Sequence, residues 1–317
     1  MKTGDEIREN VDLIVIGAGP AGLTAAQYGS RAGLKVLVFE QLSPGGQALL
    51  IDVLENYPGA APGMTGFDFC QDLHKQAEDF GAVFIMEEVL SITKEDQCFH
   101  ITSSSGTVFT VPALIFATGA KHRTLDVPGE EEFAGKGVSY CASCDGPFYK
   151  NKKIIVVGGG DTACTEALFL SRLSTQVIHI HRRERFRAQK SLAESVLHNA
   201  NIEVRFNTVI KEIRGSLKLE SVIMENLSEK SSYQEAADGV FVFTGIVPQS
   251  SLVPEAEKDE AGFIVTDQNM ASSIPGLFVA GDVRASPFRQ VVVAAGEGAI
   301  AAHSAAAYID ALKGQSY

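Results

Sequence analysis

The sequence predicts an α/β protein in which one βαβ segment occurs twice. The first copy, VDLIVIGAGPAGLTAAQYGSRAGLKVLVFE at residues 11–40, runs from β-branched residues through a glycine turn and a small-residue helical stretch into a second apolar run. The second copy, KKIIVVGGGDTACTEALFLSRLSTQVIHIHRR at residues 152–183, has the same plan. A length of 317 residues leaves room for two domains, each with its own apolar core.

Each glycine turn follows a strand and opens a helix. Gly17, Gly19 and Gly22 fit the pattern G-x-G-x-x-G, and the second copy fits G-x-G-x-x-A at Gly158, Gly160 and Ala163. Glycines at these places allow a tight turn and let a pyrophosphate approach the backbone at the helix N-terminus. One such motif is a weak signal, but two in the required context predict two Rossmann-like dinucleotide-binding domains.

The end of the second strand distinguishes the two nucleotides. Glu40 lies 23 positions after Gly17, and His181 lies 23 positions after Gly158. A carboxylate there accepts hydrogen bonds from ribose hydroxyls and repels a 2′-phosphate, so the first copy suits FAD or NAD. The second copy has basic side chains instead, at His181, Arg182, Arg183 and Arg187. Guanidinium groups match phosphate oxygens, so we expect NADP here rather than a merely solvated basic surface.

The composition narrows the function classes. The chain has 27 Lys and Arg against 39 Asp and Glu, a formal net charge of −12 and a pI near 5.1. Such a field repels phosphate, which argues against nucleic acid or an anionic membrane as a partner. The start, MKTGDEIREN, is charged, and we expect no signal peptide, no apolar stretch long enough to span a bilayer, and a cytoplasmic location.

Two of the five cysteines lie three positions apart in SYCASCDGPFY, residues 139–149. The cytosol keeps thiols reduced, so a permanent structural disulfide between Cys141 and Cys144 is not expected. A C-x-x-C pair does suit a working disulfide, in which one thiolate attacks a substrate and the other resolves the mixed disulfide. Together with two nucleotide sites, the pair indicates an electron relay from NADPH through a flavin to a disulfide.

Zinc binding and core packing are the competing interpretations of this pair. Zinc needs two further ligands, and the sequence has no second C-x-x-C and no H-x-x-x-H, so we expect no metal site. The neighbouring Asp145 and Gly146 indicate a turn or a helix start rather than a buried run. Core packing fits the other cysteines better, namely Cys70, Cys98 and Cys164.

The motifs, taken in order, carry a family resemblance over nearly the whole chain. They are GAGPAG, GGQ with ENYPG, ATGA, CASCDG, GGGDTA with HRRERFRA, and AGDVR followed by FRQVVVAAGEGAIAA. With them the chain resembles the low-molecular-weight, bacterial-type NADPH thioredoxin reductases. The resemblance implies a homodimeric FAD enzyme that reduces thioredoxin or a thioredoxin-like protein. It also implies an FAD-binding domain of residues 1–118 and 249–317, with an NADPH-binding domain of residues 119–248 inserted in it and carrying the C-x-x-C pair.

The resemblance also implies the residues of each site. The FAD pyrophosphate is expected on the first glycine turn, the adenosine ribose on Glu40, and the flavin near GGQ, ENYPG, the end of LFVAGD and FRQV. The NADPH contacts are expected on the second glycine turn and the arginines after it. In full, the expected cofactor-binding residues are Gly17, Ala18, Gly19, Pro20, Ala21, Gly22, Glu40, Gly46, Gln47, Asn56, Val89, Thr118, Gly119, Gly158, Gly160, Asp161, Thr162, Ala163, Glu166, His181, Arg182, Arg183, Arg187, Gly281, Asp282, Arg289, Gln290 and Val291.

The resemblance assigns unequal roles at the redox centre. Cys144 faces the flavin, Cys141 attacks the substrate disulfide, and Asp145 acts as a general acid, although aspartate also commonly caps a helix. Because the disulfide and the NADPH site both need the flavin, we expect the inserted domain to rotate on crossings near Gly119 and Gly245. One departure from the family is Gln249 after Pro248, where the family commonly has asparagine, and residues 1–10 have no assigned role.

Three other functions share parts of this pattern. The protein can be a reductase of another protein disulfide carrier, since the partner-facing surface cannot be read from sequence. It can be a flavin NADPH oxidase, whose activity would survive loss of the cysteines. It can also be a non-enzymatic redox sensor, which a purified protein without flavin would favour.

Overall fold

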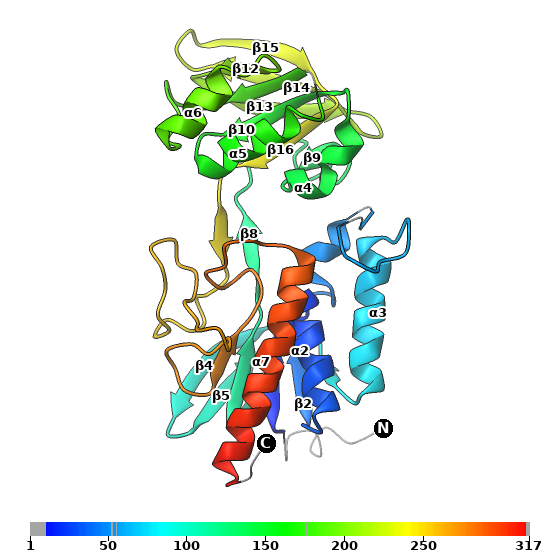
Figure 1. Cartoon of the computed structure of the whole chain (residues 1–317), viewed down its shortest axis with the longest axis vertical. Helices are drawn as coiled ribbons and strands as arrows, with labels where there is room; N and C mark the ends of the chain where they lie inside the picture. The colour runs from blue at the N-terminus through cyan, green and yellow to red at the C-terminus, as the bar shows by residue number, and fades with distance from the viewer. Residues whose placement is uncertain (1–10, 52, 55, 175, 315–317) are drawn as a thin grey trace. The chain divides into compact units, whose positions relative to one another are not determined.

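The computed structural model describes residues 11–51, 53–54, 56–174 and 176–314, and they form two compact units (Figure 1). The described residues up to Lys121 and from Val247 onward form one unit, which we call the split unit. The second, His122–Ile246, we call the inserted unit. Both have parallel sheets, and the predicted α/β class is confirmed. The assignment of one nucleotide to each domain stays a prediction.

The split unit is built on a five-stranded parallel sheet in the order β18-β7-β1-β2-β3. Its strands are β1 (Leu13–Ile16), β2 (Val36–Phe39), β3 (Val83–Ile85), β7 (Ala113–Phe116) and β18 (Leu277–Val279). Strands covered on both faces read as continuous apolar runs, which explains LIVI in β1 and ALIF in β7.

Helices cover one face of this sheet and a second sheet covers the other (Figure 1). The helices are α2 (Pro20–Arg31), α3 (Gly66–Asp79) and α7 (Val291–Leu312), with a short 3₁₀ turn, η1 (Gly46–Leu50). The antiparallel second sheet consists of β4 (Val89–Glu95), β5 (Cys98–Ser103) and β6 (Val108–Val111). Leu13 and Val15 pack towards the helices, whereas Ile14 and Ile16 pack towards β4–β6. Alternate side chains of β1 therefore pack into the two different cores.

The inserted unit repeats this plan. Its parallel sheet has the order β12-β11-β10-β16-β9, and its strands are β9 (Val138–Ser139), β10 (Lys153–Gly158), β11 (Gln176–Ile180), β12 (Ile202–Arg205) and β16 (Gly239–Phe243). One core lies under α5 (Asp161–Leu170) and α6 (Lys190–Leu197). The other lies under an antiparallel sheet of β13 (Thr208–Gly215), β14 (Leu219–Asn226) and β15 (Ser231–Ala236). The short α4 (Ala142–Asp145) and η2 (Gly146–Tyr149) lead from β9 into β10.

The two crossings between the units are β8 (Ala120–His122) and β17 (Ile246–Pro248), which pair with each other. The glycines expected at the crossings adopt the left-handed region, with φ of +70° at Gly119 and +118° at Gly245. Gln249 accepts a hydrogen bond from Thr118 Oγ1 (2.7 Å) through its carbonyl, and its backbone N–H donates to the carbonyl of Gly119 (3.0 Å). The residue that departs from the family thus ties the two crossings together on the side of the split unit.

Helix α7 corrects one expectation. By length and composition it could cross a bilayer, contrary to the prediction that no stretch is long enough. Its apolar character comes mainly from alanines, and half of its most apolar stretch is buried within the structure. A helix that is apolar on all sides is also what a protein core requires. Ala301, Ala302 and Ala305 pack into the core that α2 and the parallel sheet share.

Two glycines of α7 give a matched test of this packing. A Cβ at Gly298 would collide with the carbonyl oxygen of Ala21 at the start of α2, whereas no atom lies within 4 Å of a Cβ at Gly296. We expect Gly298→Ala to lower the free energy of unfolding by about 1–3 kcal/mol through overpacking. Gly296→Ala should raise it by about 0.5–1 kcal/mol, because alanine is the better helix former. Urea denaturation measures both, and equal effects would contradict the close α2–α7 packing.

Candidate active site

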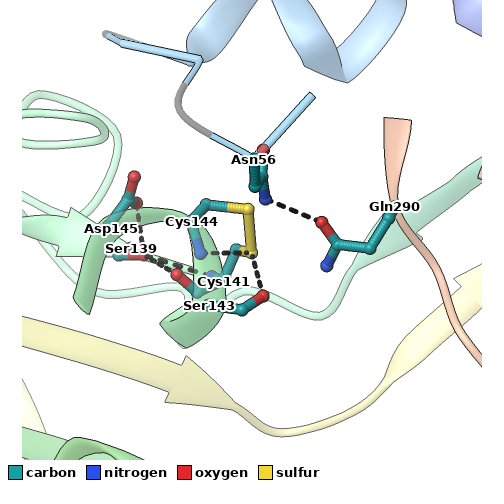
Figure 2. Close-up of a disulfide and its surroundings, with 7 residues drawn as sticks. All are labelled: Asn56, Ser139, Cys141, Ser143, Cys144, Asp145 and Gln290. Carbon is teal, nitrogen blue, oxygen red and sulfur yellow. Dashed lines mark hydrogen bonds between the residues drawn. A yellow bond between two sulfur atoms is a disulfide. The ribbon is translucent and has the colours of Figure 1, made fainter. Parts of the chain in front are cut away.

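The predicted cysteine pair forms a disulfide in the inserted unit, with the Cα atoms of Cys141 and Cys144 5.3 Å apart (Figure 2). Cys141 is the extended residue that precedes α4, and Cys144 lies within this single turn of helix. The other cysteines are free: Cys70 and Cys164 are buried and Cys98 is half-buried. Burial raises the pKa of Cys70 and of Cys164 to about 11, so both remain thiols at neutral pH.

Polar groups surround the sulfur of Cys141. The backbone N–H of Cys144 donates to Cys141 Sγ (3.2 Å), and the hydroxyl of Ser143 lies 3.5 Å from the same sulfur (Figure 2). A donor to sulfur stabilises a thiolate more than a thiol. The turn therefore favours a thiolate at Cys141 once the disulfide is reduced.

Ser139 connects the backbone of Cys141 with the side chain of Asp145. Its hydroxyl lies 2.5 Å from Asp145 Oδ2, accepts from the N–H of Cys141 (3.1 Å) and lies 3.2 Å from the carbonyl of Cys141 (Figure 2). Sequence reasoning missed Ser139, because a serine at the end of a strand is a common turn residue. Only its burial and its contacts distinguish it.

Tyr140, between Ser139 and Cys141, is fixed by a buried carboxylate. Its hydroxyl donates to Glu130 Oε1 (2.8 Å), and Glu130, only 3% exposed, also accepts from the N–H groups of Leu125 and Asp126. Burial and the Glu130 carboxylate raise the pKa of Tyr140, which keeps the phenol neutral. The Tyr140 ring stacks on His122 with centroids 5.1 Å apart. Sequence reasoning missed this network too, because PGEEEF offers three equivalent glutamates.

The first glycine turn has the features of a dinucleotide site. A Cβ at Gly22 would collide with the carbonyl oxygen of Gly17, so the tight turn into α2 requires a glycine at this position. No side chain in the described part of the chain caps α2 at Gly19, which leaves its first N–H groups for an anion. Glu40, at the end of β2, accepts from the N–H of Ala18 (2.9 Å) and of Leu42 (3.0 Å). Carboxylate oxygens with two acceptor sites each retain capacity for ribose hydroxyls.

Other expected flavin-site residues gather around this turn. A Cβ at Gly46 would lie 3.3 Å from Gly19 Cα, and one at Gly281 would lie 3.0 Å from Ala21 Cβ. Gln47 donates to the carbonyl of Ala120, which follows Thr118 and Gly119. Asn56 Nδ2 donates to Gln290 Oε1 (2.8 Å), next to Val291 at the start of α7 (Figure 2). Val89 lies apart from these contacts as a core residue of β4.

The turn after β18 holds two expected residues with buried polar atoms. Burial raises the pKa of Asp282, while the nearby Arg289 acts in the opposite direction. The Arg289 guanidinium lies over the Phe263 ring, 4.1 Å from its centroid, and its Nε is buried without a partner among the described residues. An orphaned buried donor next to a half-buried carboxyl fits a polar cofactor edge.

Glu297 of α7 supports this turn and was not expected from sequence. It is 6% exposed, accepts from the N–H of Gly281 (2.8 Å) and pairs with Arg284. Arg284 Nε donates in turn to Thr266 Oγ1 (3.0 Å). The buried Glu297–Arg284 pair is bonded to both Gly281 and Thr266, and it therefore fixes the backbone that leads into Asp282.

The second glycine turn is packed as tightly as the first. A Cβ at Gly158 would lie 2.5 Å from the carbonyl oxygen of Phe243 and 2.6 Å from Ala163 Cβ, and the ring of His181 covers Gly159. Gly160 precedes α5, and none of the described side chains caps the helix there. Its first N–H groups are therefore free for an anion, as at α2.

The arginines meet at His181. Burial, followed by the charges of Arg187, Arg183 and Arg182, lowers the pKa of His181, so three positive charges act on this strand end. All three arginines are exposed, and among the described residues none pairs with a carboxylate. The N–H of Arg187 donates to the carbonyl of Gly159 (2.6 Å), which brings the basic loop onto the glycine turn.

The remaining expected residues lie on α5. Asp161 accepts from the backbone N–H of Gln189 (2.7 Å) and so ties the basic loop to the helix, while Thr162 is exposed. Burial raises the pKa of Glu166. In the described ranges, no group of three His, Cys, Asp or Glu side chains could hold a metal ion.

The buried side chain of His179 lies against the second glycine turn. Its Nε2 lies 3.2 Å from the carbonyl oxygen of Gly158, and since a carbonyl can only accept, Nε2 carries the proton. The ring is fully buried, and burial lowers its pKa to about 4. His179 is therefore neutral at neutral pH.

Comparisons with known proteins agree in one family. A family model for pyridine nucleotide-disulphide oxidoreductases matches residues 11–298. The thioredoxin reductase of Treponema pallidum (strain Nichols) is 53% identical over 302 residues, covering 95% of this chain and 98% of that protein. That of Peptoclostridium litorale is 41% identical over 312 residues, covering 96% and 99%. The crystal structure of thioredoxin reductase from Streptococcus pyogenes MGAS5005 has a TM-score of 0.91 at 38% identity, covering 95% and 98%. The one from Giardia duodenalis has a TM-score of 0.88 at 38% identity, covering 94% and 98%.

The burial of His179 makes stability depend on pH. The pKa of His179 in the folded protein, about 4, lies below the ordinary 6.5 expected for the unfolded chain. As the pH falls from 6.5 towards 4, the unfolded state gains a proton that the folded state does not bind, so the free energy of unfolding decreases over this range. Between pH 7 and pH 4, we expect the free energy of unfolding to fall by about 3 kcal/mol more in the wild type than in His179→Leu. Urea denaturation at a series of pH values measures this. His198→Leu, at the exposed end of α6, is the control; a wild-type slope in His179→Leu would contradict the assignment.

Proposed function

Because the chain belongs to the pyridine nucleotide-disulphide oxidoreductase family and, within it, to the thioredoxin reductases, we propose that it carries electrons from NADPH through FAD and the Cys141–Cys144 disulfide to oxidised thioredoxin. It is an enzyme and a flavoprotein disulfide reductase. The observation that carries the finer proposal is the C-x-x-C disulfide in the same unit as a glycine turn with three arginines that pair with no carboxylate of the described residues.

The proposed FAD site lies in the split unit. The chemistry that FAD would supply when bound is to accept a hydride from NADPH and to deliver the electron pair to a disulfide. The free N–H groups after Gly19 would hold its pyrophosphate, and the Glu40 carboxylate its adenosine ribose. The carboxyl of Asp282 and the orphaned Nε of Arg289 would orient the flavin end.

The proposed NADPH site lies in the inserted unit. The N–H groups after Gly160 would bind the pyrophosphate, and Arg182, Arg183 and Arg187 the 2′-phosphate. In a chain of net charge −12, this local cluster is what would attract the phosphate.

The exchange with substrate uses the chain's own residues. The Cys141 thiolate, whose proton Asp145 has taken, attacks one sulfur of the substrate disulfide and forms a mixed disulfide. The departing substrate thiolate takes the proton from Asp145. The Cys144 thiol then gives its proton to Asp145, and its sulfur attacks Cys141 Sγ, which reforms the Cys141–Cys144 bond. The second substrate thiolate leaves with that proton, so the substrate gains two electrons and two protons.

Movement of the inserted unit belongs to the same proposal. The disulfide and the proposed NADPH site both lie in this unit, while the residues proposed for FAD lie in the split unit. Rotation at Gly119 and Gly245, which already have positive φ, would let each reach the flavin in turn. We also propose, from the family, a cytoplasmic homodimer that binds neither nucleic acid nor membrane.

Cofactor choice tests the NADPH site. Changing Arg182 and Arg183 together to Gln should raise the Michaelis constant for NADPH by about a hundredfold or more, because two charge-assisted hydrogen bonds are lost. The constant for NADH should stay nearly unchanged. Steady-state kinetics with both nucleotides measures this, and Arg185→Gln, an exposed arginine of the same loop, is the matched control. Equal losses with both nucleotides would assign the two arginines to folding.

The two cysteines can be separated by mutation. Cys141→Ser and Cys144→Ser should each abolish NADPH-driven reduction of thioredoxin, while NADPH should still bleach the flavin, because that step needs neither thiol. Cys141→Ser should perturb the visible flavin spectrum, and Cys144→Ser should trap a mixed disulfide with thioredoxin. Anaerobic titration and non-reducing gels measure these outcomes.

The free Cys98 supplies the matched control, since Cys98→Ser should keep full activity. Thioredoxin reduction that survives in either active-site variant would overturn the dithiol relay. Oxygen consumption that survives in both would favour a flavin NADPH oxidase. A wild type that bleaches with NADPH but passes no electrons to thioredoxin would favour another disulfide carrier.

A further inference from the structure

Ser139 is a buried hydroxyl at the redox centre to which the reaction above assigns no role. It is the last residue of β9, is 4% exposed, and is held in register by pairing with Phe241 of β16. Parallel pairing on a central neighbour fixes the backbone, so the hydroxyl has a defined position next to the C-x-x-C turn. Figure 2 shows Ser139 between the Cys141 backbone and the Asp145 carboxyl group.

The hydroxyl has one proton and two acceptors within reach. Asp145 Oδ2 lies at 2.5 Å and the carbonyl oxygen of Cys141 at 3.2 Å, while the N–H of Cys141 donates to Ser139 Oγ at 3.1 Å. A distance of 2.5 Å is typical of a hydroxyl that donates to a charged carboxylate. The proton therefore belongs to the Asp145 bond when that carboxyl is ionised.

Protonation of Asp145 reverses this bond. A protonated carboxyl can donate to Ser139 Oγ, and the serine proton can then turn to the carbonyl of Cys141 without any heavy atom moving far. The same hydroxyl thus has a satisfied arrangement for both protonation states of Asp145. In each arrangement it remains bonded to the backbone of the attacking cysteine.

We propose that Ser139 is a positioning residue for dithiol–disulfide exchange, holding the Asp145 carboxyl group in place beside the C-x-x-C turn while that group gains and loses its proton. This role rests on the proposed function, since it acts through the proton transfer assigned to Asp145. No new oxidant, reductant or proton source is needed. Ser139 returns to its starting bond once Asp145 has delivered its proton to the departing substrate thiolate.

Two tyrosines on either side of the cysteine turn stay neutral. Burial, followed by the charges of Asp145 and Asp238, raises the pKa of Tyr149 in η2 to about 12, so this phenol stays neutral. Tyr140 is bonded to Glu130 and is likewise neutral. The protons that Asp145 is proposed to carry are those of Cys141 and Cys144.

The test compares substrates whose leaving groups differ. Fully reduced, FAD-loaded enzyme is mixed anaerobically with thioredoxin, with 2-hydroxyethyl disulfide or with 4,4′-dithiodipyridine. Alkyl thiolates need a proton as they leave, whereas the pyridine thiolate leaves without one. We expect Ser139→Ala to slow the first two reactions by about tenfold to a hundredfold and to slow the third much less, because there only the transfer of the cysteine protons to Asp145 is affected.

Three variants separate positioning from simple support of the fold. Ser139→Thr keeps a hydroxyl and should restore most of the rate. Ser195→Ala, at an exposed serine of α6 that donates to the carbonyl of Ser191 in its own helix, should behave as wild type. The double variant Ser139→Ala with Asp145→Asn should be no slower than Asp145→Asn alone, because Ser139 acts through that carboxyl.

Two further readouts complete the design. The acid limb of the exchange rate in Ser139→Ala should move to higher pH by about one unit, since the lost bond favoured the charged carboxyl. Equal slowing with all three disulfides, or additive losses in the double variant, would overturn the proposal in favour of a purely structural serine. A wild type that reacts with 2-hydroxyethyl disulfide but not with thioredoxin would instead contradict the proposed acceptor and leave the Ser139 comparison intact.

Discussion

Contact between two stretches of backbone at each glycine turn is the constraint on which both units depend. In the split unit Gly22 lies against the carbonyl of Gly17, and in the inserted unit Gly158 lies against the carbonyl of Phe243. Any side chain would push the helix away from the sheet, and with it the N–H groups that we propose bind a pyrophosphate. Because Gly298 of α7 is also pressed against the start of α2, the placement of α7 depends on the same contact.

The sequence alone was enough to predict the features that depend on a local pattern of residues. The turns, the strand ends at Glu40 and His181, and the C-x-x-C pair follow fixed spacings, and the structure has the strands and helices on which the prediction placed them. It was insufficient for polar groups whose role arises from burial. Ser139, Glu130, Glu297 and His179 are ordinary residues by sequence, and only distant strands and helices make them buried and bonded. Asn56 and Gln290, 234 positions apart, meet only in the fold.

The same plan supports opposite electrostatics in the two units. In the split unit a carboxylate ends the second strand and is held by two backbone N–H groups. In the inserted unit the equivalent histidine is kept neutral by burial and by the arginine charges around it. We propose that the backbone of both turns binds a pyrophosphate, so that the choice between nucleotides depends on a few side chains at one strand end. This separation would let one fold serve the two proposed cofactors in a chain of net negative charge.

The turn that carries Cys141 and Cys144 is held in place by the residues that flank it rather than by its own short helix. Helix α4 is a single turn, too short to be stable alone, and its disulfide must open and close during exchange. On one side Ser139 bonds to the Cys141 backbone and Tyr140 is bonded to buried Glu130. On the other side Gly146 lies so close to Leu170 and Leu173 that a Cβ there would approach them to about 3 Å. With both flanks fixed, the bond between Cys141 and Cys144 can break while the backbone that positions the two sulfurs remains in place.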